Sequence, residues 1–153
     1  MARILIADDD ELIAELASEV LIDVGHACGW VTSAEAAWEL AHKRRPDVLL
    51  LDQDLPGMTG ITLLRRFRGS PLFYDLPVIM FTAMSGVQDE AHAIYAGAQD
   101  YIRKPFDPAA LISRLARVLA KYEGRPQHLD LKTDVLRATG QLHEHEMRRR
   151  RIL

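Results

Sequence analysis

The fold of this chain is decided by the stretch Pro46-Asp47-Val48-Leu49-Leu50-Leu51-Asp52-Gln53-Asp54-Leu55-Pro56-Gly57. Its apolar run, Val48 to Leu51, is short and unbroken, which is typical of a parallel strand covered on both faces. The run stops at Asp52, and the chain then turns, because proline cannot donate to a ladder and glycine tolerates positive φ. Open α/β sheets bind ligands at the carboxyl ends of their strands, so Asp52 is the first candidate site residue.

Composition places the chain among ordinary cytoplasmic domains. Its 153 residues, 48% of them hydrophobic, are enough for a single domain with a substantial core. No run approaches the roughly 18 to 20 apolar residues that a membrane helix needs, and the first residues do not resemble a signal peptide. Cys28 is the single cysteine, so no internal disulfide can form, which fits a reducing cytoplasm.

Further strand-like segments flank the central one. They cover residues 4–7, 26–32, 78–81 and 100–103, and each is bounded by turn or helix signals. Helical patterns alternate with these strands. The first helix should bury Ile13, Leu16, Val20 and Val24, and Ser33 should cap a second helix over residues 34–44. Three further helices should start at Thr59 or Gly60, cover residues 87–96, and follow Asp107. Alternating strands and helices predict an α/β fold, with a doubly wound five-stranded parallel sheet and five helices.

Polar residues of matched character end four of the predicted strands: Asp8 and Asp9, Asp52, Thr82 and Lys104. Because parallel strands end at one edge of a sheet, these side chains should meet in space. Crowded carboxylates repel one another, and Mg²⁺, which prefers carboxylate, carbonyl and water oxygens, would relieve that repulsion. A lysine adds a point charge for a phosphoryl oxygen and a threonine adds a neutral donor. This combination suits the transfer of a phosphoryl group to a carboxylate.

Residues 1–120 resemble the receiver domain of two-component response regulators and are close in plan to the chemotaxis receiver. The resemblance rests on an ordered set of short motifs: Ile4-Leu5-Ile6-Ala7-Asp8-Asp9-Asp10, Leu51-Asp52, Leu55-Pro56, Gly60, Phe81-Thr82-Ala83, Gly97-Ala98, Asp100-Tyr101 and Lys104-Pro105-Phe106. It implies a flavodoxin-like fold with strand order 2-1-3-4-5. Residues 121–153 then form a C-terminal extension, made of a linker, a hairpin or helix, and an arginine-rich end.

The resemblance also implies roles at the edge of the sheet. Asp52 would be the phosphoacceptor for a phosphohistidine on a histidine kinase or phosphotransfer protein. Asp9 would bind Mg²⁺ directly, Asp8 would bind it through water, and the Asp54 main-chain carbonyl would supply a further ligand. Such a protein is a stoichiometric phosphoacceptor, with self-dephosphorylation as its one hydrolytic reaction, and is not a turnover enzyme.

A conformational switch is the second implication. Lys104 would pair with the phosphoryl group, and its peptide bond to Pro105 is expected to be cis, as is usual for the family. Thr82 would bond a phosphoryl oxygen and leave space into which Tyr101 can rotate. This motion would change the face formed by the fourth helix, fifth strand and fifth helix, where a downstream protein partner would bind.

Simpler interpretations stay open beside these. Asp8, Asp9 and Asp10 could serve merely as caps of the first helix. Lys104 could be an ordinary surface lysine, Thr82 a turn residue and Tyr101 a strand aromatic. Asp54 and Met84 depart from the commonest family residues, which leaves the hydrolysis rate open. Asp52-Gln53-Asp54 also spells the Asp-x-Asp of haloacid-dehalogenase-like phosphatases, but Pro56 stands where that family needs Thr or Val.

The C-terminal extension differs in charge from the rest of the chain. Residues 1–120 carry a balance of −6 and residues 121–153 a balance of +3, which together give the net charge of −3. Arg148, Arg149, Arg150 and Arg151 could be a solvated terminus, or an anion site for a ligand such as cyclic di-GMP. Docking on a protein partner or a homodimer arm are the other interpretations. The extension faintly resembles the start of a winged-helix domain but is too short to complete one, so sequence-specific DNA binding is not expected.

Overall fold

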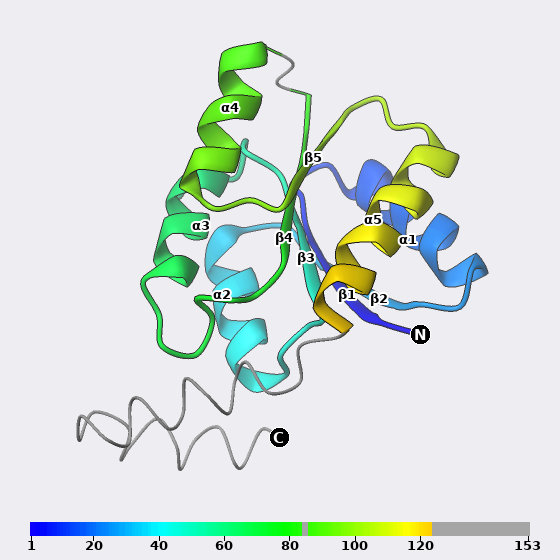
Figure 1. The fold of residues 1–153 in the computed structure, drawn as a ribbon, viewed down its shortest axis with the longest axis horizontal. Helices are drawn as coiled ribbons and strands as arrows, with labels where there is room; N and C mark the ends of the chain where they lie inside the picture. Colours follow the sequence, from blue (N-terminus) through cyan, green and yellow to red (C-terminus); the bar gives the residue numbers. More distant parts are fainter. Residues whose placement is uncertain (84–85, 124–153) are drawn as a thin grey trace.

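A computed structural model describes residues 1–83 and 86–123. The strands are β1 (Arg3–Ala7), β2 (Ala27–Val31), β3 (Val48–Leu51), β4 (Val78–Thr82) and β5 (Asp100–Arg103). They form one parallel sheet in the order β2-β1-β3-β4-β5, with β3 at its centre (Figure 1). The α/β fold predicted from the sequence, including the strand order implied by the resemblance, is therefore confirmed.

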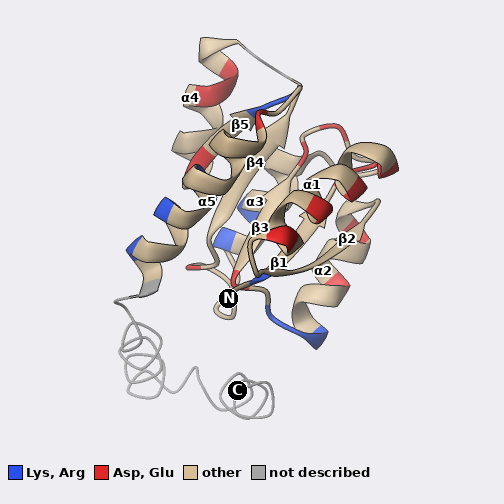
Figure 2. Cartoon of the chain, turned by 90° about the vertical axis from the view of Figure 1, so that its right-hand side faces the viewer, with Lys and Arg blue, Asp and Glu red and all other residues tan. Residues whose placement is uncertain are grey.

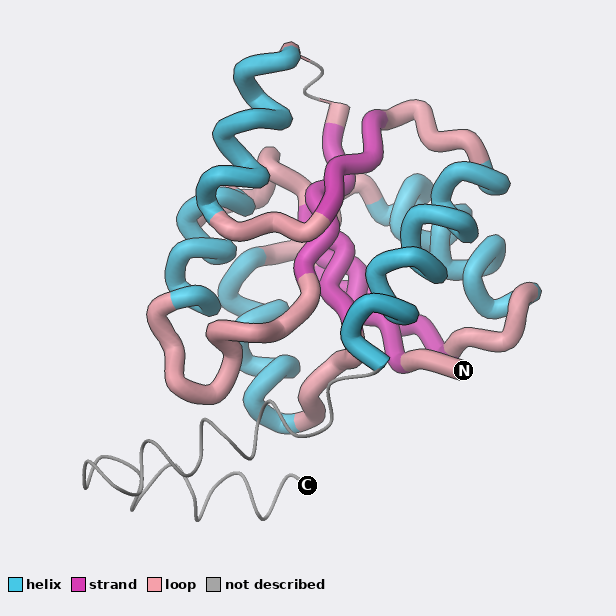
Figure 3. Tube along the Cα trace, viewed as in Figure 1, coloured by secondary structure: helices cyan, strands magenta, loops and turns pink. Residues whose placement is uncertain are grey.

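Helices cover both faces of this sheet, as Figure 3 shows with the strands running between two helical layers. The helices are α1 (Glu11–Asp23), α2 (Ala34–Lys43), α3 (Gly60–Arg68), α4 (Val87–Ala96) and α5 (Pro108–Glu123). One apolar core joins the sheet to α2, α3 and α4, and the other joins it to α1 and α5. No helix in the described ranges is long and apolar enough to cross a bilayer.

The predicted helix ends are largely confirmed. Ser33 Oγ accepts a hydrogen bond from Ala36 N at 3.1 Å, and Asp107 Oδ2 accepts one from Ala110 N at 3.2 Å. Gly97 ends α4 with a φ of +115°, a left-handed conformation that favours glycine. Helix α5 continues to Glu123, so the first three residues of the predicted C-terminal extension are helical, and its remainder lies outside the described residues.

The predicted buried face of α1 is confirmed only in part, because Ile13 and Val20 pack partly buried against the core but the other two predicted residues do not. Leu16 and Val24 are 43% and 47% exposed, whereas Ala14, Ala17 and Leu21 are fully buried. Both sets fit helical spacing, and the small alanine side chains let the helix lie close to the sheet, which decides between them. The exposed side of α1 also carries its acidic residues, seen in red in Figure 2. Strand β2 is shorter than predicted, because His26 and Thr32 lie outside it.

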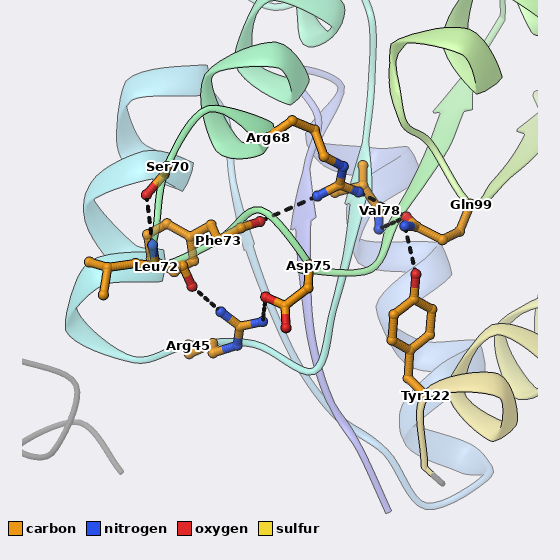
Figure 4. A network of polar contacts seen from close by, with 9 residues as sticks. All are labelled: Arg45, Arg68, Ser70, Leu72, Phe73, Asp75, Val78, Gln99 and Tyr122. Atoms are coloured by element: carbon orange, nitrogen blue, oxygen red, sulfur yellow. Dashed lines mark hydrogen bonds and ion pairs between the residues drawn. The ribbon is translucent and has the colours of Figure 1, made fainter. Parts of the chain in front are cut away.

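A network of polar contacts ties the loops together at the amino ends of the strands (Figure 4). The Arg68 guanidinium donates to the carbonyl oxygens of Gly97, at 2.8 and 3.1 Å, and Phe73, at 3.3 Å. It also donates to Gln99 Oε1 at 3.0 Å, and the Gln99 amide donates to the Tyr122 hydroxyl at 2.8 Å. These contacts join α3, the turn before β5, and α5 on the side of the sheet opposite to its carboxyl edge.

Candidate functional site

The register of the parallel strands brings the polar strand ends to one edge. Ala7 pairs with Leu51 across β1 and β3, so Asp8 and Asp52 leave neighbouring strands at the same level. Asp52 N donates to Ala7 O at 2.9 Å and Lys104 N donates to Thr82 O at 3.0 Å. These backbone hydrogen bonds extend the ladder past the strands and fix where each side chain begins.

Three carboxylates converge at this edge. A carboxylate oxygen from each of Asp8, Asp9 and Asp52 lies within 4.8 Å of the other two. Asp8 and Asp52 are buried, with 0% and 4% of their surfaces exposed, whereas Asp9 faces solvent. Burial disfavours a charged carboxylate, so this cluster needs compensation by cations or hydrogen-bond donors.

Lys104 supplies part of that compensation. Its Nζ lies 3.1 Å from Asp52 Oδ2 and also forms an ion pair with Asp8 Oδ2. Burial raises the pKa of the Asp8 carboxyl above its ordinary value, although the hydrogen bond from Lys104 opposes this change. Burial would lower the pKa of Lys104, but its contacts with Asp8 and Asp52 outweigh burial and raise that pKa. The lysine is therefore held in its charged form between the two acids.

Backbone amides hold the other oxygens of the two buried acids. Asp10 N donates to Asp8 Oδ1 at 2.9 Å, and Asp54 N donates to Asp52 Oδ1 at 3.3 Å. Each acid thus has one oxygen toward the lysine and one toward the backbone of its own loop. This arrangement fixes the orientation of both carboxylates and suits a hard cation, which prefers oxygen ligands from several carboxylates.

The predicted switch residues border one cavity. Thr82 and Tyr101 are 1% and 5% exposed, and both line a cavity of about 210 Å³ between α3 and α4. Burial raises the pKa of the Tyr101 hydroxyl. The peptide bond between Lys104 and Pro105 is cis, as the resemblance implies.

Some predicted site features lie beyond what the structure tests. The side chain of Asp54 is exposed, and the role of its main-chain carbonyl as a metal ligand stays a prediction. Met84 and the arginines 148–151 lie outside the described residues. Sequence reasoning also missed a contact of Gln53, whose side chain reaches the first turn of α3. The available signals were the polar residue Gln53 directly after Asp52 and the glycine Gly60 at the start of the helix.

Comparison with known proteins identifies the family to which this chain belongs. Residues 4–116 match the family model of the response regulator receiver domain. The match covers most of the chain, so the chain belongs to the response regulator receiver domain family, which acts in two-component signalling.

Individual relatives agree with this family. The chain is 39% identical to the phosphate regulon transcriptional regulatory protein PhoB of Pseudomonas aeruginosa, over 77% of this chain and 52% of that protein. It is 34% identical to the DNA-binding response regulator MtrA of Mycolicibacterium smegmatis, over 87% of this chain and 59% of that protein. The chain thus spans between half and three fifths of these two relatives.

Solved structures give the same result at the level of fold. A putative response regulator from Chloroflexus aurantiacus superposes with a TM-score of 0.75 at 39% identity, covering 78% of this chain and 98% of that one. The chemotaxis protein CheY4 of Vibrio cholerae superposes with a TM-score of 0.72 at 30% identity, covering 77% of this chain and 98% of that one. Both are matched over nearly their whole length.

Proposed function

We propose that this receiver domain accepts a phosphoryl group on Asp52 from a phosphohistidine of a histidine kinase or phosphotransfer protein. The observation that carries the proposal is the position of Asp52: it is buried, 3.1 Å from Lys104 Nζ, and clustered with Asp8 and Asp9. A buried carboxylate with a fixed cation on one side and further acids on the other is suited to nucleophilic attack on phosphorus.

The transfer consumes no reactant other than the phosphohistidine donor. One Asp52 carboxylate oxygen attacks the phosphorus, an O–P bond forms, and the N–P bond to the donor imidazole breaks. The imidazole nitrogen keeps the electron pair of the broken bond. Lys104 neutralises charge on the phosphoryl oxygens, because its raised pKa keeps the ammonium protonated at neutral pH.

Mg²⁺ is the cofactor that this donor set fits. Asp9 is open to solvent and Asp8 and Asp52 are buried, which matches a cation that keeps several waters while it binds a few carboxylates. When bound, Mg²⁺ would supply positive charge that offsets the repulsion between the acids and an incoming phosphoryl group. We place the Asp54 main-chain carbonyl among its ligands.

The response is proposed to pass through Thr82 and Tyr101. Thr82 ends β4 beside the acceptor edge, and Tyr101 lines the same cavity from β5. A phosphoryl group that recruits Thr82 would free room for Tyr101, and the surface formed by α4, β5 and α5 would change with it. We propose that a downstream protein partner binds this surface.

The domain is proposed to act stoichiometrically, with slow loss of its own phosphoryl group and no turnover of a small substrate. The reducing cytoplasm is its proposed compartment, supported by the single cysteine. The names of PhoB and MtrA describe a transcriptional regulator and a DNA-binding regulator, which weakens the sequence expectation against DNA binding. Because the chain spans only 52% and 59% of those proteins, DNA binding is a property of the relatives and is not part of this proposal.

Beryllofluoride with Mg²⁺ tests the proposed acceptor by NMR. It imitates a phosphoryl group on a carboxylate, so the amide resonances of Thr82, Tyr101 and Lys104 should shift in the wild type. Asp52→Asn should abolish these shifts, while Asp54→Asn, a neighbouring exposed acid, should keep them. Shifts that persist in Asp52→Asn would place the reaction elsewhere. Multiple turnover of a small phosphate ester would favour the Asp-x-Asp phosphatase interpretation instead.

A second candidate function rests on the run of four arginines from Arg148 to Arg151. Guanidinium groups fork onto phosphates, so the extension could bind an anionic ligand such as cyclic di-GMP. Calorimetry with cyclic di-GMP tests this idea on the full chain. Binding that survives Asp52→Asn and is lost when all four arginines become alanine supports it, whereas binding equal in both variants, or none, rules it out.

A further inference from the structure

We propose that Gln53 is a positioning residue for phosphoryl transfer, holding the acceptor loop of residues 52–54 against the first turn of α3. The inference rests on the proposed function, since it concerns the geometry of Asp52 and of the metal ligands beside it. Gln53 itself would touch neither the phosphoryl group nor the metal, because its side chain is engaged on the helix.

The first observation is a hydrogen bond between the Gln53 side chain and the backbone of α3. Gln53 Oε1 accepts from Ile61 N at 2.8 Å. The first amides of a helix have no partner inside it, and Thr59 Oγ1, the cap of α3, accepts from Thr62 N at a longer 3.3 Å. The shorter of these two hydrogen bonds at the start of α3 therefore comes from the acceptor loop and not from the residue that caps the helix.

The second observation is the close approach of the two backbones. The Gln53 carbonyl oxygen accepts from Gly60 N at 3.0 Å and from Leu55 N at 3.2 Å. A Cβ added to Gly60 would stand 2.2 Å from the Asp52 carbonyl oxygen. Only a glycine leaves room for this contact, so the acceptor loop rests directly on the helix start.

The helix is a firm support for this loop. The inward side chains of α3, Leu63, Leu64 and Phe67, are fully buried in the core shared with β3. A loop joined to such a helix by one side-chain and one backbone hydrogen bond loses little further freedom when metal and phosphoryl group arrive. The carbonyl of Asp54 and the carboxylate of Asp52 would then be held in place before either ligand binds.

A matched pair of variants separates positioning from helix stability. Gln53→Met keeps the length of the side chain and removes the acceptor for Ile61 N. Thr59→Ala removes the neighbouring cap of the same helix without touching the acceptor loop. Both variants should weaken the start of α3 to a similar degree, measured by thermal unfolding and by hydrogen exchange of the Ile61 and Thr62 amides in metal-free protein.

The distinguishing readouts are the Mg²⁺ affinity, followed by NMR titration, and the lifetime of the phosphorylated form. We expect Gln53→Met to weaken Mg²⁺ binding by roughly 2- to 10-fold, the range of one net hydrogen bond, and to change the phosphoryl lifetime. Thr59→Ala should leave both close to wild type.

The positioning role would be overturned if the two variants had the same Mg²⁺ affinity and the same phosphoryl lifetime, or if Gln53→Met bound Mg²⁺ as tightly as the wild type. These outcomes can be told apart from failure of the proposed function. If the wild type binds Mg²⁺ but takes up no phosphoryl group, the acceptor function is wrong while the Mg²⁺ titration still decides the role of Gln53. A wild type without Mg²⁺-dependent shifts overturns both.

Discussion

Lys104 Nζ lies 3.1 Å from Asp52 Oδ2, although the two residues are 52 positions apart in the chain. The contact crosses from the end of β5 to the end of β3, past the β4 strand that ends between them. The same ammonium group pairs with Asp8, so one cation serves two buried acids. Asp8, Asp52 and Lys104 are therefore electrostatically coupled, and removing the charge of one should change how the other two contribute to stability.

Replacing Lys104 with methionine should destabilise the metal-free protein. The variant leaves Asp8 and Asp52 buried without their shared cation, which costs on the order of 2 kcal/mol of unfolding free energy at pH 7. Urea unfolding with and without Mg²⁺ measures this loss. Mg²⁺ should restore part of it, because a metal can take over neutralisation of the acids.

The same variant should have a defined pH dependence. Because burial raises the pKa of Asp8 above 3.8 in the folded state, protonation of Asp8 favours folding. This contribution is full below 3.8 and is lost as pH rises through the higher folded value. Without Lys104 that folded value rises further, so the deficit of Lys104→Met should be smaller at pH 5 than at pH 7. Lys104→Arg, which keeps the charge, is the control, and a deficit independent of pH contradicts this account.

Arg68→Met should destabilise the fold without changing the chemistry at the opposite edge. The variant removes the donor to the carbonyl oxygens of Gly97 and Phe73 and to Gln99 Oε1. Unsatisfied buried acceptors cost about 1 to 3 kcal/mol each, partly relieved by water, so we expect a total loss of about 2 to 3 kcal/mol. Denaturant unfolding measures the loss of unfolding free energy, and beryllofluoride binding reports on the site around Asp52. Weakened beryllofluoride binding in a folded variant would contradict the separation of the two edges.

Cys28 should react slowly with alkylating agents. Burial raises the pKa of its thiol to about 11, from an ordinary value of 9.0. The thiolate is the nucleophile, so its fraction at pH 8, and with it the rate with iodoacetamide, should be about 100-fold below that of a free thiol. Intact-mass kinetics in buffer and in denaturant make the comparison. A rate in buffer equal to that in denaturant would show that the thiol is not protected.

The arrangement of the sheet could be predicted from the sequence because its signals are local and redundant. Short apolar runs bounded by turn signals, such as Val48 to Leu51, favour buried strands, and strands that alternate with helices favour a parallel sheet. Parallel strands place the acids that follow β1 and β3 and the lysine that follows β5 at the same edge of the sheet. The strand order implied by the resemblance then brings these ends close together, so the convergence of Asp8, Asp52 and Lys104 was predicted from the two together.

Other features depend on packing that a sequence pattern does not contain. Leucines and alanines alternate on α1 with equally good helical spacing, and only the close approach to the sheet selected Ala14 and Ala17 over Leu16. The role of Gln53 was not predicted, because its partner, the Ile61 amide, comes close only when α3 packs beside the loop of residues 52–54. Long-range hydrogen bonds of this kind depend on the folded arrangement of the chain and leave no local pattern in the sequence.

Phosphoryl uptake from acetyl phosphate with Mg²⁺, followed by intact mass spectrometry, tests the central claim most directly. The wild type should gain the mass of one phosphoryl group, the gain should require Mg²⁺, and Asp52→Asn should gain none while remaining folded. No uptake by the wild type, or equal uptake by Asp52→Asn, would contradict the assignment of Asp52 as the acceptor.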